Sequence, residues 1–286
     1  SWQHQNVPYL YITEELADRI LAVRGYSLAE LRARQESLGS GEGFALETGV
    51  TADLSVPIAT HQAAPARNVV AMCPGTDAQL DEQAIFVVAH YDGLGRWPDG
   101  VLFPGANDNA SGVAVMLEAA RVLQQSGFQP KRTIFFVAWC PAERRQELDL
   151  GRMLSARLGF QEAYRIVAVV ELRGVGAGLG SRLVLDQASS GRLTDAFREA
   201  ARRQGVAVTT RGRVLHGSPI YPQYGQSFIP LPGRRRLPYL ALSWDGSDAH
   251  EHRPTDTPDR IDPQKLAQTG RLLALALMRV AGESRY

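Results

Sequence analysis

The chain has 286 residues, of which 44% are hydrophobic and 21% are charged, as in ordinary globular proteins. Its formal net charge of +1 gives no reason to expect nucleic acid or an anionic membrane as a partner. No stretch approaches the ~20 consecutive apolar residues that a membrane-spanning helix needs.

Residues 1–60 are predicted to form an N-terminal region of two short helices and a hairpin. A first helix is expected to begin at Thr13 and to stop near Gly25. The segment Ser27-Leu28-Ala29-Glu30 fits a capping box, which predicts a second helix up to about Leu38. Weak alternation of apolar residues between positions 44 and 58 predicts a bent strand.

Residues 61–286 alternate between buried strands and amphipathic helices. The predicted strands are 68–73, 84–89, 133–138, 166–170, 183–185, 206–209 and 237–243. The predicted helices are 110–123, a stretch ending near 158, 193–203 and 263–280, and a long loop is expected over 211–236. This alternation predicts a single α/β domain whose mixed, mostly parallel central sheet is flanked by helices.

The two cysteines, Cys73 and Cys140, each end an apolar, strand-like run. Two cysteines do not make a disulfide framework, and without a Cys-x-x-Cys pair they do not make a cysteine-based zinc site. We therefore expect two buried, free thiols, which behave as small apolar groups.

Polar side chains follow several of the predicted strands. Because open α/β sheets bind ligands beyond the carboxyl ends of their strands, these residues are candidates for a site. They are His90 and Asp92, Asp108 in the loop before a helix, Glu143, Glu171, and the group Asp248, His250, Glu251 and His252. Of these, His250 is expected to be an ordinary loop histidine. Histidines and carboxylates are the ligands of a nitrogen- and oxygen-ligated zinc site, so their joint occurrence indicates a metal centre.

Three motifs resemble the co-catalytic zinc aminopeptidases of the secreted bacterial leucyl aminopeptidase and aminopeptidase Y type. They are His90-Tyr91-Asp92, Pro104-Gly105-Ala106-Asn107-Asp108-Asn109-Ala110-Ser111-Gly112 and His252-Arg253-Pro254-Thr255-Asp256-Thr257-Pro258-Asp259. Glutamate carboxypeptidase and glutaminyl cyclase are relatives of that family. The resemblance runs from about Asn68 to the C-terminus and implies a phosphorylase/hydrolase-like fold with a zinc exopeptidase domain at 61–286. Residues 7–31 resemble the tail of a protease-associated domain.

The resemblance also implies a role for each site residue, with one or two zinc ions as cofactor. His90 and Glu171 would bind the first zinc, and Asp92 would orient the His90 ring. Asp108 would bridge both metals, and His252 would bind the second.

The sequence departs from the family where two adjacent glutamates are expected, a general base and a ligand of the second zinc. Without a gap, Ala142 takes the base position and Glu143 the metal position. Two other alignments make Glu143 the base or bring Glu147 near the pair, and none supplies both carboxylates. We favour the ungapped alignment, because the buried strand determines where the chain emerges.

The leading functional prediction is a hydrolase, a zinc aminopeptidase that uses metal-activated water and has activity impaired by the missing base. The alternatives are a degenerate relative that binds peptides or a protein, and aminoacyl transfer of the glutaminyl cyclase kind. The expected partner is a peptide or small aminoacyl substrate, with neither nucleic acid nor membrane. The family implies a secreted or periplasmic protein. No signal peptide precedes Ser1, so we expect a trimmed or processed start.

Overall fold

The computed structural model describes residues 12–37, 43–51, 53, 67–97, 99–140, 164–189, 191–212, 238–246 and 248–284. The chain divides into two compact units, residues 1–63 and 64–286. Ala142, Glu143 and Glu147 lie outside the described residues, as do the predicted helix ending near residue 158 and most of the predicted loop 211–236.

The first unit contains two helices, α1 (Glu14–Ala22) and α2 (Leu28–Glu36), as predicted. Thr13 caps α1 by accepting a hydrogen bond from the Leu16 amide, 3.2 Å away. The predicted capping box is present at α2, where the side chains and amides of Ser27 and Glu30 bond reciprocally. The predicted strand over 44–58 is wrong for its described part, since residues 43–51 and 53 contain no strand. Weak alternation does not make a strand without a partner to pair with, and Gly49 is left-handed at φ 68°.

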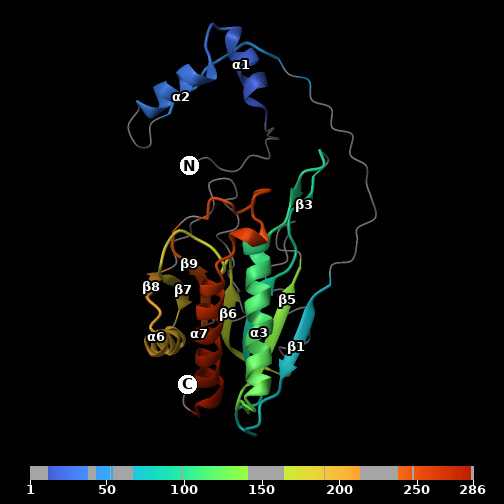
Figure 1. Cartoon of the computed structure of the whole chain (residues 1–286), viewed down its shortest axis with the longest axis vertical. Coiled ribbons are helices and arrows are strands. Elements are labelled where there is room, and N and C mark those ends of the chain that lie inside the picture. The colour runs from blue at the N-terminus through green and yellow to red at the C-terminus, as the bar shows by residue number, and fades with distance from the viewer. Residues whose placement is uncertain are drawn as a thin grey trace. The chain divides into compact units, whose positions relative to one another are not determined.

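The second unit is built on a seven-stranded sheet in the order β1-β5-β2-β6-β9-β7-β8 (Figure 1). The strands are β1 (Val69–Cys73), β2 (Gln83–His90), β5 (Thr133–Trp139), β6 (Arg165–Leu172), β7 (Leu183–Ser189), β8 (Val208–Gly212) and β9 (Tyr239–Trp244). The four central strands β5, β2, β6 and β9 are parallel, whereas β1 and β7 run antiparallel to their inner neighbours. The predicted mixed, mostly parallel sheet is therefore confirmed, and its four central strands end at one edge.

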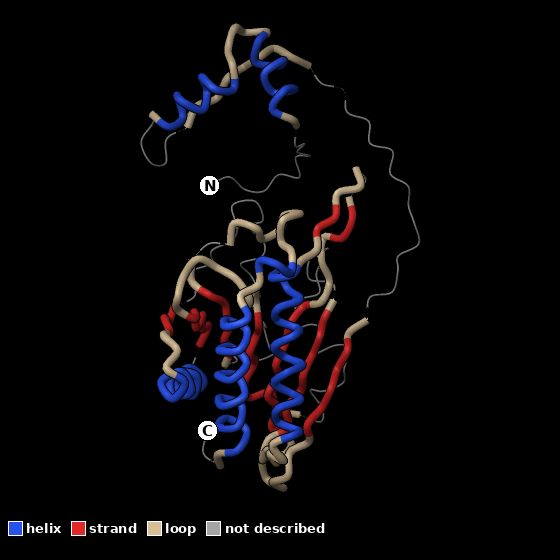
Figure 2. Tube along the Cα trace, viewed as in Figure 1, coloured by secondary structure: helices blue, strands red, loops and turns tan. Residues whose placement is uncertain are grey.

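Helices α3 (Gly112–Gln125), α6 (Gly191–Gln204) and α7 (Pro263–Gly282) pack on one face of the sheet, with α7 in contact with both others (Figure 2). Between them and the sheet lies the larger core, which includes Ile85, Val87, Met116, Phe197 and Leu277. The alternate residues of β2, such as Phe86, belong to a second core cluster on the opposite face of the sheet. A strand buried on both faces explains the continuous apolar run at 84–89.

The two cysteines lie at opposite ends of the β1–β5 pair. Cys73 is opposite Ile134 in the register, while Cys140 follows the far end of β5, roughly 20 Å away at ~3.3 Å per residue. A disulfide needs Cα atoms within about 7 Å, so both thiols are free, as predicted. Both are only half-buried, so the prediction of full burial is wrong.

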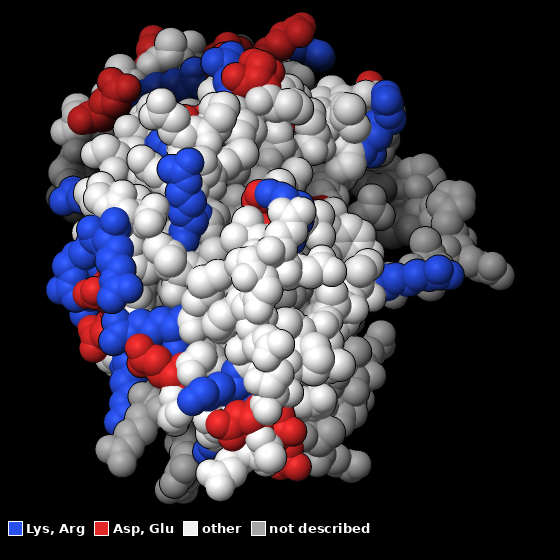
Figure 3. Space-filling model, turned by 60° about the horizontal axis from the view of Figure 1, so that its bottom comes forward, with Lys and Arg blue, Asp and Glu red and all other residues white. Residues whose placement is uncertain are grey.

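Charged side chains on the second unit are largely paired. Arg198 bonds Asp195 and Arg203 bonds Glu199 along α6, and the face drawn in Figure 3 carries basic and acidic side chains side by side. Among the described residues, no helix has the length and apolar character that crossing a bilayer requires.

Candidate metal centre

The loop that leads into α3 presents Asp108 at the carboxyl edge of the sheet. It begins at Gly105, whose φ of 66° is left-handed and where a Cβ atom would lie 2.9 Å from the Asp108 carbonyl oxygen. The following turn, η1 (Ala106–Ser111), is interrupted at Asp108 and Asn109, whose backbone angles are not helical. Glycine is therefore required for a loop that folds this tightly.

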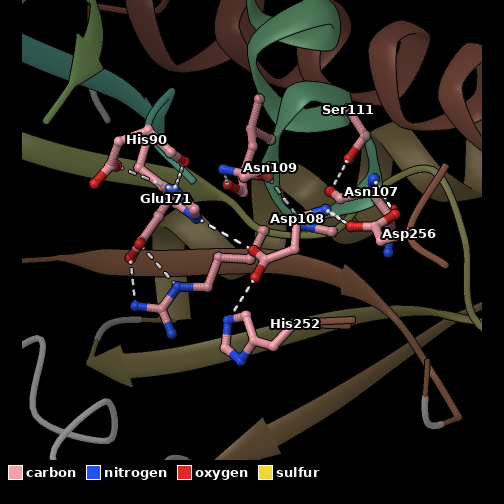
Figure 4. A network of polar contacts seen from close by, with 12 residues as sticks. His90, Asn107, Asp108, Asn109, Ser111, Glu171, His252 and Asp256 are labelled. Carbon is pink, nitrogen blue, oxygen red and sulfur yellow. Dashed lines mark hydrogen bonds and ion pairs between the residues drawn. The ribbon is translucent and has the colours of Figure 1, made fainter. Parts of the chain in front are cut away.

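Two buried asparagines on either side of Asp108 tie the loop to the segment that follows β6. Asn107 Oδ1 accepts a hydrogen bond from the Gly176 amide at 2.8 Å. Asn109 Nδ2 donates to the Leu172 carbonyl at 2.9 Å, and its Oδ1 accepts from the Gly174 amide at 3.1 Å. These side-chain amides bond to protein groups on the neighbouring segment and so lock the loop in place (Figure 4).

The backbone of the loop is held by Asp256 and Ser111. Asp256 is 1% exposed, and its two oxygens accept hydrogen bonds from the Asn107 and Asp108 amides at 2.7 and 3.0 Å. Ser111 Oγ closes the turn by donating to the Asn107 carbonyl at 2.6 Å. Asp256 is a positioning residue that the sequence analysis quoted in a motif but gave no role.

The carboxylate of Asp108 lies between two histidines that are far apart in the sequence (Figure 4). Its Oδ1 is 3.2 Å from His90 Nε2, and its Oδ2 is 2.9 Å from His252 Nε2. Burial alone would raise the pKa of Asp108, but the hydrogen bonds with His252 and His90 outweigh it and hold that pKa well below its usual range. Asp108 is therefore ionised, with one oxygen directed at each imidazole.

These spacings fit a bridging role. Two ligand atoms bound at ~2.0–2.1 Å to one tetrahedral zinc ion are about 3.3 Å apart. The two oxygen–nitrogen distances at Asp108 are close to that value, and each involves a different oxygen. The donor set of imidazole and carboxylate is also the one that zinc uses in proteins.

His90 is the last residue of β2 and is 8% exposed. Its second ring nitrogen, Nδ1, lies 3.6 Å from Asp92 Oδ1 and 3.4 Å from the Asp92 carbonyl oxygen. Asp92 thus lies on the side of the ring away from Asp108, where a partner that orients the imidazole is expected.

Glu171 lies in β6 and is 2% exposed, but its carboxylate bonds to residues other than Asp108 and the two histidines. It accepts hydrogen bonds from Arg173 Nε at 2.8 Å, from Arg173 Nη2 at 3.1 Å and from the Tyr239 hydroxyl. Burial would raise the pKa of Glu171, and the Arg173 guanidinium more than offsets this and lowers it. The Glu171 oxygens thus contact Arg173 and Tyr239, and the role of Glu171 as a zinc ligand stays a prediction.

The turn after β9 brings Glu251 to the site, a candidate to which the family resemblance gave no role. Ligand atoms of Asp108, Glu251 and His252 all lie within 4.8 Å of one another. His250 is outside this group, and its Nδ1 lies 2.8 Å from Thr255 Oγ1. The only signal for Glu251 was its place among the polar residues that follow the last strand.

A small pocket opens beside Asp108 and His252, with an accessible volume of about 10 Å³, which is room for about one water molecule. Its apolar wall includes Leu94 and Phe103, and Phe103 belongs to the hairpin β3 (Gly95–Arg96) and β4 (Leu102–Phe103). The Trp97 ring packs on Phe103 at 5.0 Å between centroids and is 46% exposed. The site therefore combines ionisable groups with an adjoining apolar surface.

The sequence of the chain is similar to known proteins. The sequence profile of peptidase family M28 matches residues 68–277, which is more than half of the chain. YfbL, an uncharacterized protein of Escherichia coli (strain K12), is 41% identical over 81 residues, 28% of this chain and 23% of YfbL.

Two solved structures share the fold. BSAP, a zinc aminopeptidase from Bacillus subtilis, superposes with a TM-score of 0.56 at 24% identity, over 77% of this chain and 51% of BSAP. An aminopeptidase from Aneurinibacillus sp. strain AM-1 gives 0.55 at 25% identity, over 76% of this chain and 48% of that enzyme. This chain thus spans about half the length of these two enzymes. From the profile match and the arrangement of its motifs, the chain belongs to peptidase family M28.

Proposed function

We propose that this protein is a zinc-dependent exopeptidase, an aminopeptidase that removes N-terminal residues from peptides. The observation that carries the proposal is the Asp108 carboxylate, which directs one oxygen at His90 and the other at His252. Membership of peptidase family M28 and the fold shared with two aminopeptidases support it.

His90, Asp108 and His252 would hold the metal, with Glu171 and Glu143 as the further ligands that the family resemblance implies. Zinc bound there would supply Lewis-acid chemistry, which polarises a carbonyl and lowers the pKa of water. Asp108 would contribute negative charge to both metal positions, and Asp92 would keep the His90 ring oriented.

Hydrolysis also requires a group that takes a proton from the attacking water and returns it to the leaving amine. Ala142 stands where the resemblance puts that carboxylate, so another group such as Glu147 would have to serve instead. Loss of a positioned base typically costs ~10²–10⁴-fold in rate. We therefore expect slow turnover.

The missing base and the engagement of Glu171 by Arg173 favour a second candidate function. In it, the protein binds the N-terminal part of a peptide or of a protein partner without hydrolysing it.

The test is hydrolysis of aminoacyl p-nitroanilides, compared with the same compounds acetylated on the α-amino group, together with metal analysis of the purified protein. An aminopeptidase cleaves only the free amines, loses activity to a chelator and regains it with zinc. Equal cleavage of acetylated substrates would contradict the exopeptidase assignment. Bound peptide with no cleavage would favour the binding function.

A further inference from the structure

We infer that Glu251 is a ligand of the metal position that Asp108 and His252 share. This inference rests on the proposed zinc dependence and adds a residue that the family motifs do not supply. It means that the turn after β9 contributes two neighbouring ligands, Glu251 and His252, to that position.

The first support is the geometry of the turn. Side chains of adjacent residues normally point in opposite directions in extended chain. At residues 250–252 the chain instead turns, and His252 takes a left-handed φ of 56°. Ligand atoms of Glu251 and His252 consequently lie within 4.8 Å of each other and of Asp108. Non-glycine residues in this conformation are uncommon and gather at functional sites.

The second support is that the turn is anchored to the loop that carries Asp108. Asp248 accepts hydrogen bonds from the His250 amide at 2.9 Å and from Asn107 Nδ2 at 2.7 Å. At its other end, the turn is closed by the Asp256 amide, which donates to the Arg253 carbonyl at 3.1 Å. Both aspartates therefore hold the backbone around Glu251 at a set position relative to Asp108.

The carboxylates of Asp248 and Asp256 hold the backbone and the Asn107 side chain. Asp248 uses both oxygens to accept N–H hydrogen bonds, and so does Asp256. Glu251, in contrast, has a carboxylate oxygen within 4.8 Å of ligand atoms of both Asp108 and His252.

The third support is charge. Histidines are neutral when they bind a metal, and the Arg173 guanidinium offsets the charge of Glu171. Among the described residues on the His252 side of the site, Asp108 alone would then contribute negative charge, a single unit against the two positive charges of a divalent ion. Glu251 raises that to two, which matches the charge of the ion.

The experiment measures metal binding on the full chain, independently of activity. Zinc stoichiometry after dialysis and the visible absorption of the cobalt(II) form are compared for wild type, Glu251→Gln, Glu143→Gln and Asp259→Asn. Asp259 is the matched control, an acid in the short 3-10 helix η4 (Pro258–Arg260) whose side chain is 73% exposed and pairs with Arg260. Glu251→His is included because it removes the charge but keeps a ligand atom.

We expect Glu251→Gln to lose one zinc equivalent or to bind it at least tenfold more weakly, with an altered cobalt(II) spectrum. Glu251→His should retain the ion and show a different spectrum, while Asp259→Asn should match wild type. Unchanged zinc binding in Glu251→Gln overturns the inference, most directly if Glu143→Gln loses the ion instead. The proposed function is not affected by that result. A wild type that binds neither metal overturns both. If wild type binds zinc but cleaves no aminoacyl substrate, the proposed aminopeptidase activity is rejected. Loss of zinc in Glu251→Gln would in that case still support the inference.

Discussion

The two halves of the candidate site are built in different ways. His90 and Glu171 come from the buried ends of β2 and β6 and are 8% and 2% exposed. Glu251 and His252 come from an irregular turn, and the His252 side chain is 23% exposed. The strand half is positioned by the sheet, whereas the turn half depends on a few hydrogen bonds between side chains and backbone. We therefore expect the turn half to be the more sensitive to single polar substitutions.

The largest effect is expected where the halves meet, at Asp108. Asp108→Asn removes the charge and one acceptor that face the two histidines, so metal affinity should fall more than ~100-fold and hydrolysis should drop to background. Metal analysis and a chromogenic aminoacyl substrate measure both. Because the side chain keeps its size, circular dichroism should match wild type. If Asp108→Asn retained its zinc, the two halves would bind metal independently of Asp108, and its bridging role would be contradicted.

The next effect concerns the missing base, where the family resemblance puts Ala142. Ala142→Glu should raise turnover by ~10²–10⁴-fold if the rest of the site is assembled, since it restores proton transfer. Ala142→Gln, of similar size and without basicity, should leave the rate unchanged. If wild type is already fast and Glu143→Gln abolishes turnover while zinc is retained, Glu143 is the base and the ungapped alignment is wrong.

The sensitivity of the two halves to substitution is best compared at Asp256, which holds the turn half, and at Asp92, which lies beside the His90 ring of the strand half. Asp256→Asn turns one acceptor into a donor against a buried amide, so it should cost about 1–3 kcal/mol of unfolding free energy and ~10–100-fold in metal affinity. Asp92→Asn should cost less, because the Asp92 carbonyl is also near His90 Nδ1. Urea unfolding and zinc titration measure the two effects. Equal losses in both variants would show that the halves do not differ.

The smallest effect is expected at His250. His250→Ala removes a contact with Thr255 on the turn, so unfolding free energy should change by no more than ~0.5 kcal/mol and zinc affinity should be unchanged. Loss of zinc in this variant would make His250 a ligand, contrary to its interpretation as a loop histidine.

The same contrast explains what could be predicted from the sequence. Strand β2 is recognisable because burial on both faces demands a continuous apolar run, and His90 then follows from where that strand ends. Glu251 could not be placed, because its approach to Asp108 depends on the left-handed His252 and on hydrogen bonds to residues more than a hundred positions away. The strand expected over 44–58 failed for a related reason, since pairing depends on a partner that alternation does not reveal.

The side chains that lock the Asp108 loop have a consequence for the dynamics of its backbone. The amides of Asn107, Asp108, Gly174 and Gly176 all donate to buried or half-buried side chains, although none belongs to a regular helix or strand ladder. Their hydrogens should exchange with solvent as slowly as those of the central strands, because exchange requires a collective opening rather than local fraying. Deuterium uptake in this irregular segment would then report on the integrity of the site before any metal or substrate is added.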